Sequence, residues 1–145
     1  PGQTVSTGMS LTVPGDATPA TSPVNAIATK GTYSGTGTAN CTVMAKLTVT
    51  VSIPNASYKL GSTVPITAMV QSGTSPVSGA AVVFTLRAPT GSTSTKKAIT
   101  GASGTAVWNY KLNRRDPTGT YTVTAKATYG GQTVTSDPKT SEATQ

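Results

Sequence analysis

The chain has 145 residues, with 30 Thr, 15 Ser and 15 Gly but only 11 basic and 4 acidic residues, for a formal charge of +7. It contains no His and one cysteine, Cys41. Most enzyme mechanisms need a His, a carboxylate pair or an activated thiol, and zinc sites need several Cys or His ligands. We therefore expect no enzyme activity, no metal site and no cofactor.

The basic charge could attract an anionic partner such as a polysaccharide. Two adjacent pairs stand out: Arg114 and Arg115 in a predicted loop are the first candidate contact, and Lys96 and Lys97 on a polar strand are the second. No aromatic residues are interleaved with these pairs, so nucleic acid is not an expected partner. The favoured alternative is that the four side chains only keep the surface soluble.

No run of 18 apolar residues occurs, so the sequence predicts no membrane-spanning helix. The start of the sequence does not have the pattern of a signal peptide, which favours a mature protein or an excised fragment. A composition rich in Thr, Ser and Gly and poor in charge is typical of bacterial secreted and surface modules. The predicted location is therefore secreted or at the cell surface.

Residues 1–44 are predicted to form a linker, an extended arm or part of a β-module. Residues 9–13 alternate like a short strand, 16–23 favour a loop, 25–30 and 31–34 favour short strands, and 35–38 favour a flexible segment.

Residues 21–26 also resemble 74–80, which indicates either a second module or, as we favour, a chance match. Cys41 is predicted to be a buried free thiol in a strand.

Residues 45–138 alternate apolar and polar side chains with period two, between frequent turns. We expect strands near 47–53, 64–70, 80–86, 93–100, 106–112, 121–127 and 133–136. Pro65 lacks a donor N–H, so its end of the second strand should lie at an edge or a bulge. About seven strands in about 95 residues predict an all-β, immunoglobulin-like antiparallel β-sandwich. The polar residues 139–145 are predicted to be a C-terminal tail.

Three side chains carry more specific expectations. Tyr121, near the start of the sixth strand, is predicted to be a tyrosine corner whose hydroxyl bonds the preceding loop. Trp108 alternates with apolar neighbours, which favours a core position over an exposed platform for stacking sugars. Asp116 is expected to hydrogen-bond within its own loop, because one carboxylate is weak evidence for a calcium site.

Four short motifs resemble bacterial immunoglobulin-like domains, both the repeats of invasin-type adhesins and the macroglobulin-type modules of secreted hydrolases. They are Tyr-x-x-Gly at 58–61, Pro-Val-x-Gly-Ala at 76–80, Thr100 with Gly104-x-Ala106, and Gly119-x-Tyr121-x-Val123. The resemblance covers residues 45–138 and implies the sandwich fold. These motifs occupy turn and core positions, so they say little about function.

The resemblance implies a non-catalytic accessory module of a larger secreted bacterial protein, acting as a spacer or as a weak substrate-binding or surface-binding unit. Its partners would be the other domains of the parent protein, and a polysaccharide or another surface polymer. The alternative is a structural subunit of an adhesin or an extracellular filament, in which residues 1–44 exchange a strand with a neighbour.

Overall fold

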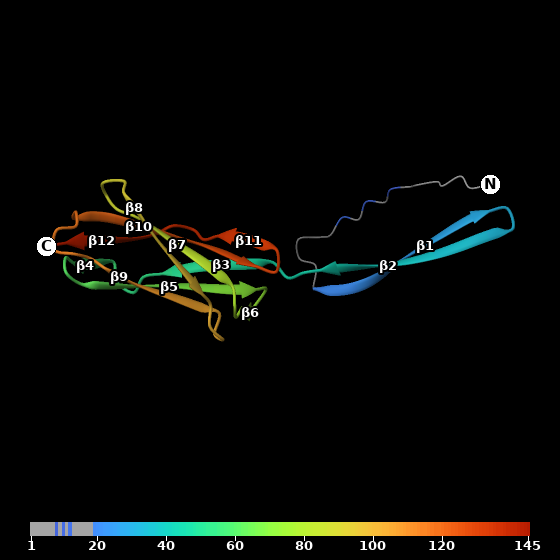
Figure 1. Ribbon diagram of the computed structural model, residues 1–145, viewed down its shortest axis with the longest axis horizontal. Coiled ribbons are helices and arrows are strands. Elements are labelled where there is room, and N and C mark those ends of the chain that lie inside the picture. Colours follow the sequence, from blue (N-terminus) through green and yellow to red (C-terminus); the bar gives the residue numbers. More distant parts are fainter. Residues whose placement is uncertain (1–7, 9, 11, 13–18) are drawn as a thin grey trace. The chain divides into compact units, whose positions relative to one another are not determined.

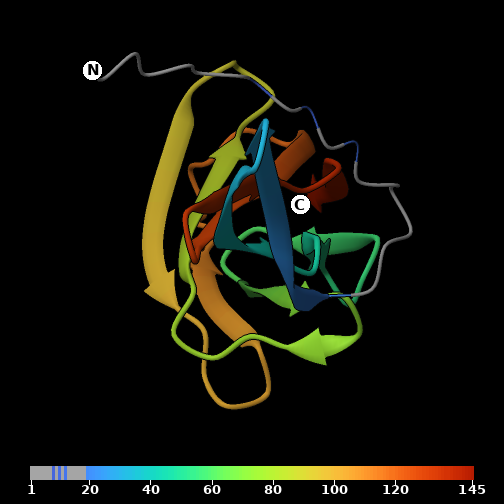
Figure 2. The ribbon, with the colours of Figure 1, turned by 90° about the vertical axis from the view of Figure 1, so that its right-hand side faces the viewer.

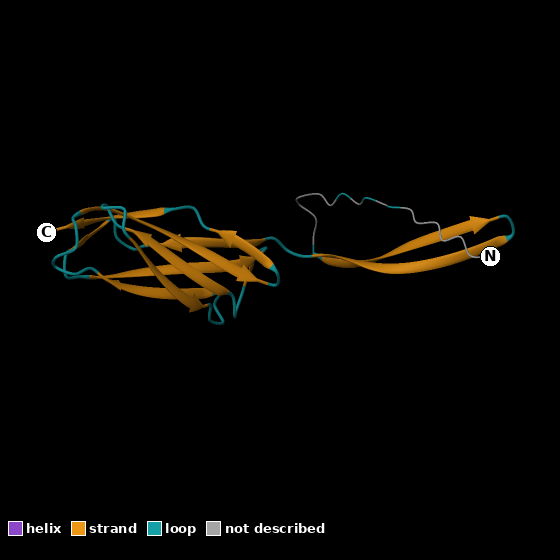
Figure 3. Ribbon diagram, turned by 45° about the horizontal axis from the view of Figure 1, so that its top comes forward, coloured by secondary structure: helices purple, strands orange, loops and turns teal. Residues whose placement is uncertain are grey.

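A computed structural model describes residues 8, 10, 12 and 19–145, and every regular element among them is a β-strand (Figure 3). The chain divides into two compact units, Pro1–Ala45 and Lys46–Gln145. An all-β fold follows from the abundance of Thr and Val, whose branched side chains suit a pleated sheet, and from the frequent glycine turns.

The first unit contains one long antiparallel hairpin, formed by β1 (Ala20–Lys30) and β2 (Tyr33–Val43). Its turn is Gly31-Thr32, with Gly31 at a φ of 61°, as a two-residue hairpin turn of type II′ requires. The prediction of a loop at 16–23 was wrong for residues 20–23, which lie in β1, and its residues 16–18 lie outside the described residues. The prediction of a flexible segment at 35–38 was wrong, because these residues lie within β2. The predicted strand at 9–13 lies largely outside the described residues.

The second unit is a β-sandwich of two antiparallel-rich sheets, as predicted (Figures 1 and 2). Its strands are β3 (Leu47–Ser52), β4 (Ser57–Lys59), β5 (Thr63–Ser72), β6 (Ser75–Pro76), β7 (Ala81–Arg87), β8 (Thr93–Ile99), β9 (Thr105–Lys111), β10 (Gly119–Tyr129), β11 (Gln132–Thr135) and β12 (Lys139–Thr144). All seven predicted strands are present, and β4, β6 and β12 are additional.

One sheet has β5 between β3 and β9, with the short β6 beside β5. The other has the order β4-β12-β10-β7-β8, and β11 pairs with the second half of β10. Pro65 faces β9 at Asn109, beyond the point where β3 stops pairing at Thr67. The missing N–H of Pro65 therefore leaves no gap in the ladder, which confirms the predicted edge position.

The core lies between the two sheets and is formed by alternate residues of the long strands. Phe84, Ile66, Val70, Val82 and Val123 are the largest side chains that are fully buried. No disulfide joins the described strands, so apolar packing and the hydrogen-bonded ladders hold this sandwich together. The edge strand β8 is the long yellow strand at one side of Figure 2.

Residues 139–145, predicted to be a tail, instead contribute the strand β12. It pairs antiparallel with the first half of β10 and parallel with β4. Ser141 and Ala143 point into the sandwich and are 7% and 3% exposed. The Ser141 hydroxyl donates to the carbonyls of Asn55 and Ala56 at 3.2 Å. The strand escaped prediction because its inward positions carry small residues rather than Val, Ile or Leu.

Thr100 and Gly104 show what two of the motifs do in this fold. The buried Thr100 hydroxyl donates to the Val77 carbonyl at 2.6 Å and accepts from the Ala80 N–H at 2.9 Å, which fixes the loop before β7. Gly104 has a φ of 72°, and a Cβ at this position would lie 2.7 Å from the carbonyl oxygen of Val70. Both motifs therefore specify the fold, in agreement with the expectation that they say little about function.

The sandwich begins and ends at opposite ends of its long axis. Lys46 lies at the end formed by the β10–β11 turn, where the Leu47 N–H donates to the side chain of Gln132. At the other end, the Leu60 N–H donates to the Thr144 carbonyl at 2.7 Å, next to the C-terminus (Figure 1). At this end β4 pairs in parallel with the last strand, β12.

Candidate functional site

Arg114 and Arg115 are exposed in the loop between β9 and β10. Asp116 fixes this loop, because its carboxylate accepts the Asn113 N–H at 2.8 Å and its own N–H donates to the Asn113 carbonyl at 3.1 Å. The expectation that Asp116 bonds its own loop is confirmed. The side chain of Arg114 lies against Gly61, where a Cβ would be 3.5 Å from Arg114 Cγ.

The two lysines of the second predicted pair are also exposed, but they point to opposite sides of β8. Lys97 pairs with Val83 on the outer face of the sheet, whereas Lys96 pairs with Phe84, whose side chain points inward. Because adjacent residues in a strand face opposite sides, the pair cannot bind one partner surface as a unit. The loop that carries Arg114 and Arg115 is a separate element, so these four residues do not form one cluster.

The sheet instead brings Lys97 close to two cations that sequence analysis did not select. Lys126 of β10 pairs with Val83 from the side opposite to Lys97, so the two lysines flank β7 at about 10 Å. Arg87 lies four residues further along β7 on the same outer face, about 13 Å away. We call Arg87, Lys97 and Lys126 the cationic face; all three are exposed, and β7, β8 and β10 contain no acidic residue.

Threonines fill the space between the charges of the cationic face. Thr95, Thr85 and Thr124 form a row across β8, β7 and β10, and Thr93 and Thr122 flank Arg87. Hydroxyls beside ammonium and guanidinium groups can donate hydrogen bonds to sulfate, phosphate or carboxylate groups. The strand alternation around Lys126, between Ala125 and Ala127, was the signal in the sequence that could have placed it on this face.

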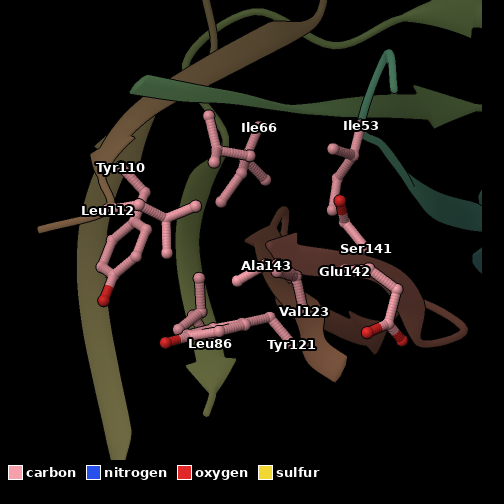
Figure 4. A pocket seen from close by; sticks show the side chains of 11 residues that line it. Ile53, Ile66, Leu86, Tyr110, Leu112, Tyr121, Val123, Ser141, Glu142 and Ala143 are labelled. Carbon is pink, nitrogen blue, oxygen red and sulfur yellow. The ribbon is translucent and has the colours of Figure 1, made fainter. Parts of the chain in front are cut away.

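The small cavity inside the sandwich is not suited to a substrate. It has about 20 Å³ of free space, roughly enough for one water molecule, and it is lined mainly by apolar side chains that include Ile66, Leu86 and Val123 (Figure 4). Burial and the negative charge of Asp116 raise the pKa of Tyr110 and that of Tyr121. Both phenols therefore stay neutral near pH 7.

The described residues contain no group of three or more His, Cys, Asp or Glu side chains that could hold a metal ion. Within the same part of the chain, no helix has the length and hydropathy needed to cross a bilayer.

The aromatic residues divide between core and surface. Trp108 is half-buried on the inward face of β9, with its ring 6.1 Å from Phe84 and 5.3 Å from Tyr110, so the predicted core position is confirmed in part. Tyr58 is half-buried, whereas Tyr33 is 82% exposed and Tyr129 is 46% exposed.

Cys41, predicted to be buried, is half-exposed in β2.

No protein-family model and no curated protein matches the sequence. Among solved structures, the fold is similar to a tetra-tandem repeat in the extending region of a large adhesion protein, with a TM-score of 0.56 and 20% identity. The match covers 87% of this chain and 32% of the solved chain, so this chain spans about a third of that structure. A match of this extent continues beyond Lys46–Gln145 into Pro1–Ala45.

Two further solved structures are similar to this chain with TM-scores below 0.5. One is to the Pseudomonas fluorescens alkylpurine DNA glycosylase AlkC, with a TM-score of 0.48 and 15% identity over 68% of this chain and 30% of that one. The other is to a β-glucosidase from Listeria innocua, with a TM-score of 0.44 and 14% identity over 74% of this chain and 17% of that one.

Proposed function

We propose that this chain is a non-catalytic spacer module of a large bacterial adhesion protein, secreted or held at the cell surface, and that its sandwich is an immunoglobulin-like domain of the bacterial type. The observation that carries the proposal is the position of the two ends of the sandwich, beside the β10–β11 turn and beside Leu60. A module of this kind adds its full length to the reach of a polypeptide. The similarity to a repeat from the extending region of an adhesion protein supports the same role.

The pairing of β4 with β12 suits a module that carries tension. Ser57, Tyr58 and Lys59 pair in parallel with Glu142, Ala143 and Thr144. Pulling on the two ends of the sandwich draws these strands past each other along their length. The backbone hydrogen bonds from the Glu142 N–H to Ala56 and from the Leu60 N–H to Thr144 are then loaded together rather than one after another.

Single-molecule stretching of the full chain, held at its two ends, tests the proposal. We expect one force peak for the sandwich, followed by a gain in contour length of about 330–360 Å minus the end-to-end length of the folded sandwich, since about 100 residues extend by roughly 3.3–3.6 Å each. A sandwich that unravels gradually, without a peak, would contradict the spacer role.

Two variants at Glu142 test whether the parallel pair carries the load. Glu142→Pro removes the N–H that donates to the Ala56 carbonyl at 2.8 Å, and we expect it to lower the unfolding force. Glu142→Gln keeps this N–H and serves as the matched control. Equal forces for both variants would show that the β4–β12 pair is not the loaded contact.

A further inference from the structure

The first strand and the turn of the hairpin β1–β2 resemble β10 and the turn after it, although β2 pairs with β1 over eleven residues and β11 pairs with β10 over four. Both β1 and β10 have 11 residues, and each is followed by a two-residue turn with a glycine at positive φ, Gly31 and Gly130. When the turns are superposed along the sequence, residues 24–32 correspond to 123–131. The identical positions are Val24 and Val123, Ala26 and Ala125, Ala28 and Ala127, Thr29 and Thr128, and Gly31 and Gly130.

The identical apolar residues differ sharply in burial. Val123 is 1% exposed, and Ala125 and Ala127 are 0% exposed, because β10 packs its inward face against the opposite sheet. In β1, Val24 is only half-buried, and Ala26 and Ala28 are exposed. The same residues that form core in the sandwich therefore face solvent in the hairpin.

The register of β1 and β2 places these residues on one apolar face. Ala26 and Ala28 pair with Gly37 and Gly35, and the face continues through Ala39, Cys41 and Val43 of β2. The opposite face is mainly polar, with Thr21, Asn25, Thr29, Thr36 and Thr38 among its residues. Within the described residues this sheet has two strands, and two strands alone are marginally stable in water.

We propose that the hairpin β1–β2 is the closing hairpin of a second immunoglobulin-like module. Its apolar face packs on the remaining strands of a module of this class, in the place that β10 and β11 occupy in the sandwich. Those strands can belong to the same polypeptide or to another one. The proposal depends on the fold of the sandwich and not on its role in adhesion.

Two further observations support packing of the hairpin on the strands of a second module. In an intact copy of this sandwich the place proposed for the hairpin is already filled by its own β10. Only Met44, Ala45 and Lys46 separate β2 from β3, so a module closed by the hairpin would lead directly into the sandwich. Such an arrangement agrees with the similarity to a tandem repeat, which extends into the first unit.

An extended chain tests the proposal. Residues 46–118 of this sequence are joined to Ala20 in place of residues 1–19, so that β1 follows a second copy of β3–β9 as β10 does in the sandwich. Hydrogen exchange of the amides in 20–43 and the reaction of the Cys41 thiol with a maleimide are compared with those of the unextended chain. We expect both to slow by at least about 100-fold, as in a buried strand. Unchanged rates would overturn the proposal.

Two substitutions on opposite faces of β1 sharpen this test. Ala26→Lys puts a charge where Ala125 is fully buried, and we expect it to abolish the protection. Ile27→Lys is the matched control, because the corresponding residue of β10 is the exposed Lys126. The amides of the original sandwich should stay protected in both variants. Loss of protection in neither or in both would contradict the face that we assign.

A reciprocal exchange covers the case in which the extended chain does not fold. Replacing residues 123–131 by 24–32 within the sandwich should leave the melting temperature within about 5 °C of the original, and an unfolded sandwich would overturn the proposal. Light scattering of the unextended chain tests whether a second copy of the chain packs on the apolar face instead. Concentration-dependent dimers with a protected Cys41 would assign the apolar face to a second copy of the chain and would also overturn the proposal.

Discussion

The hydroxyl of Tyr121 donates a hydrogen bond of 2.9 Å to the carbonyl of Pro117, four residues earlier in the chain. The predicted tyrosine corner is thereby confirmed, and it ties the β9–β10 loop to the start of β10. Tyr121 is 5% exposed, so its loss would leave the Pro117 carbonyl without this partner.

Tyr121→Phe should therefore lower the free energy of unfolding by about 1–3 kcal/mol, the usual cost of a lost hydrogen bond at a buried group. Denaturant titration measures the change. Tyr33→Phe removes a hydroxyl from an exposed ring and should have no measurable effect. Equal stability of the Tyr121 variant and the original chain would refute the role assigned to the corner.

Gly104→Ala should destabilise the sandwich by about 2–4 kcal/mol, because the new Cβ meets the backbone at Val70 and Val77 and the positive φ is strained for Ala. Thermal unfolding measures the cost. Gly101→Ala is the matched control in the same turn, where the nearest contact to a new Cβ is 4.0 Å. If both variants melt alike, the close approach at Gly104 is not a constraint on this fold.

Thr100→Val keeps the shape of the side chain but removes the hydroxyl, which leaves the Val77 carbonyl and the Ala80 N–H without this partner in a buried site. We expect a loss of about 2–6 kcal/mol, from two buried groups at about 1–3 kcal/mol each. Thr100→Ser retains the hydroxyl and should be less destabilised. Chemical denaturation of both variants decides the matter, and a more stable Val variant would contradict it.

The sandwich should lose stability as the pH rises above about 10. Burial and the charge of Asp116 raise the pKa of Tyr110 and Tyr121 above the value in an unfolded chain, so the folded state holds these protons more tightly. Their contribution is complete below the unfolded pKa and is lost as the pH rises through the folded pKa. Urea midpoints between pH 8 and 11.5 should show the decline, and Tyr110→Phe should reduce its slope. A midpoint that rises with pH would contradict this assignment.

The cationic face should bind an anionic polymer more strongly than the β9–β10 loop, which carries Arg114 and Arg115, does. Substituting Lys97→Gln with Lys126→Gln, or Arg114→Gln with Arg115→Gln, removes two charges in each case. Retention on heparin at several salt concentrations compares the two. We expect the lysine variant to lose more retention, with a salt slope reduced by about one for each contact removed. Equal losses would indicate net charge alone, and no retention of the original chain would refute binding.

How much of this architecture could be predicted depended on where the large apolar residues lie. Leu47, Val49, Ile66, Val82 and Phe84 alternate strongly, and the strands that contain them were found. In β12 the inward residues are Ser141 and Ala143, which give no such signal. The strand predicted at 25–30 lies within β1, but its small residues Ala26 and Ala28 do not indicate an apolar face. Gly35 and Gly37, predicted to be flexible, lie in β2.

The candidate site was harder to predict than the strands because it depends on pairing between distant strands. Lys96 and Lys97 are neighbours in sequence but point to opposite faces, whereas Lys97 and Lys126 are 29 positions apart and flank the same Val83. The adjacency of Lys96 and Lys97 in the sequence therefore suggested a charged cluster, but the alternation of side chains along β8 places them on opposite faces of the sheet. The register across β7, which joins Lys97 to Lys126, is set by the whole sandwich and is not encoded in any local pattern.

The edge strand β8 has a consequence for folding when similar modules follow one another in a polypeptide. A free strand edge can pair with the edge of another strand, including one in a neighbouring module. Lysines on an edge oppose such pairing, because two like-charged edges repel each other. Lys96 and Lys97 would then act during refolding by keeping neighbours from exchanging strands, so their value would appear in the yield of correctly folded chains rather than in stability.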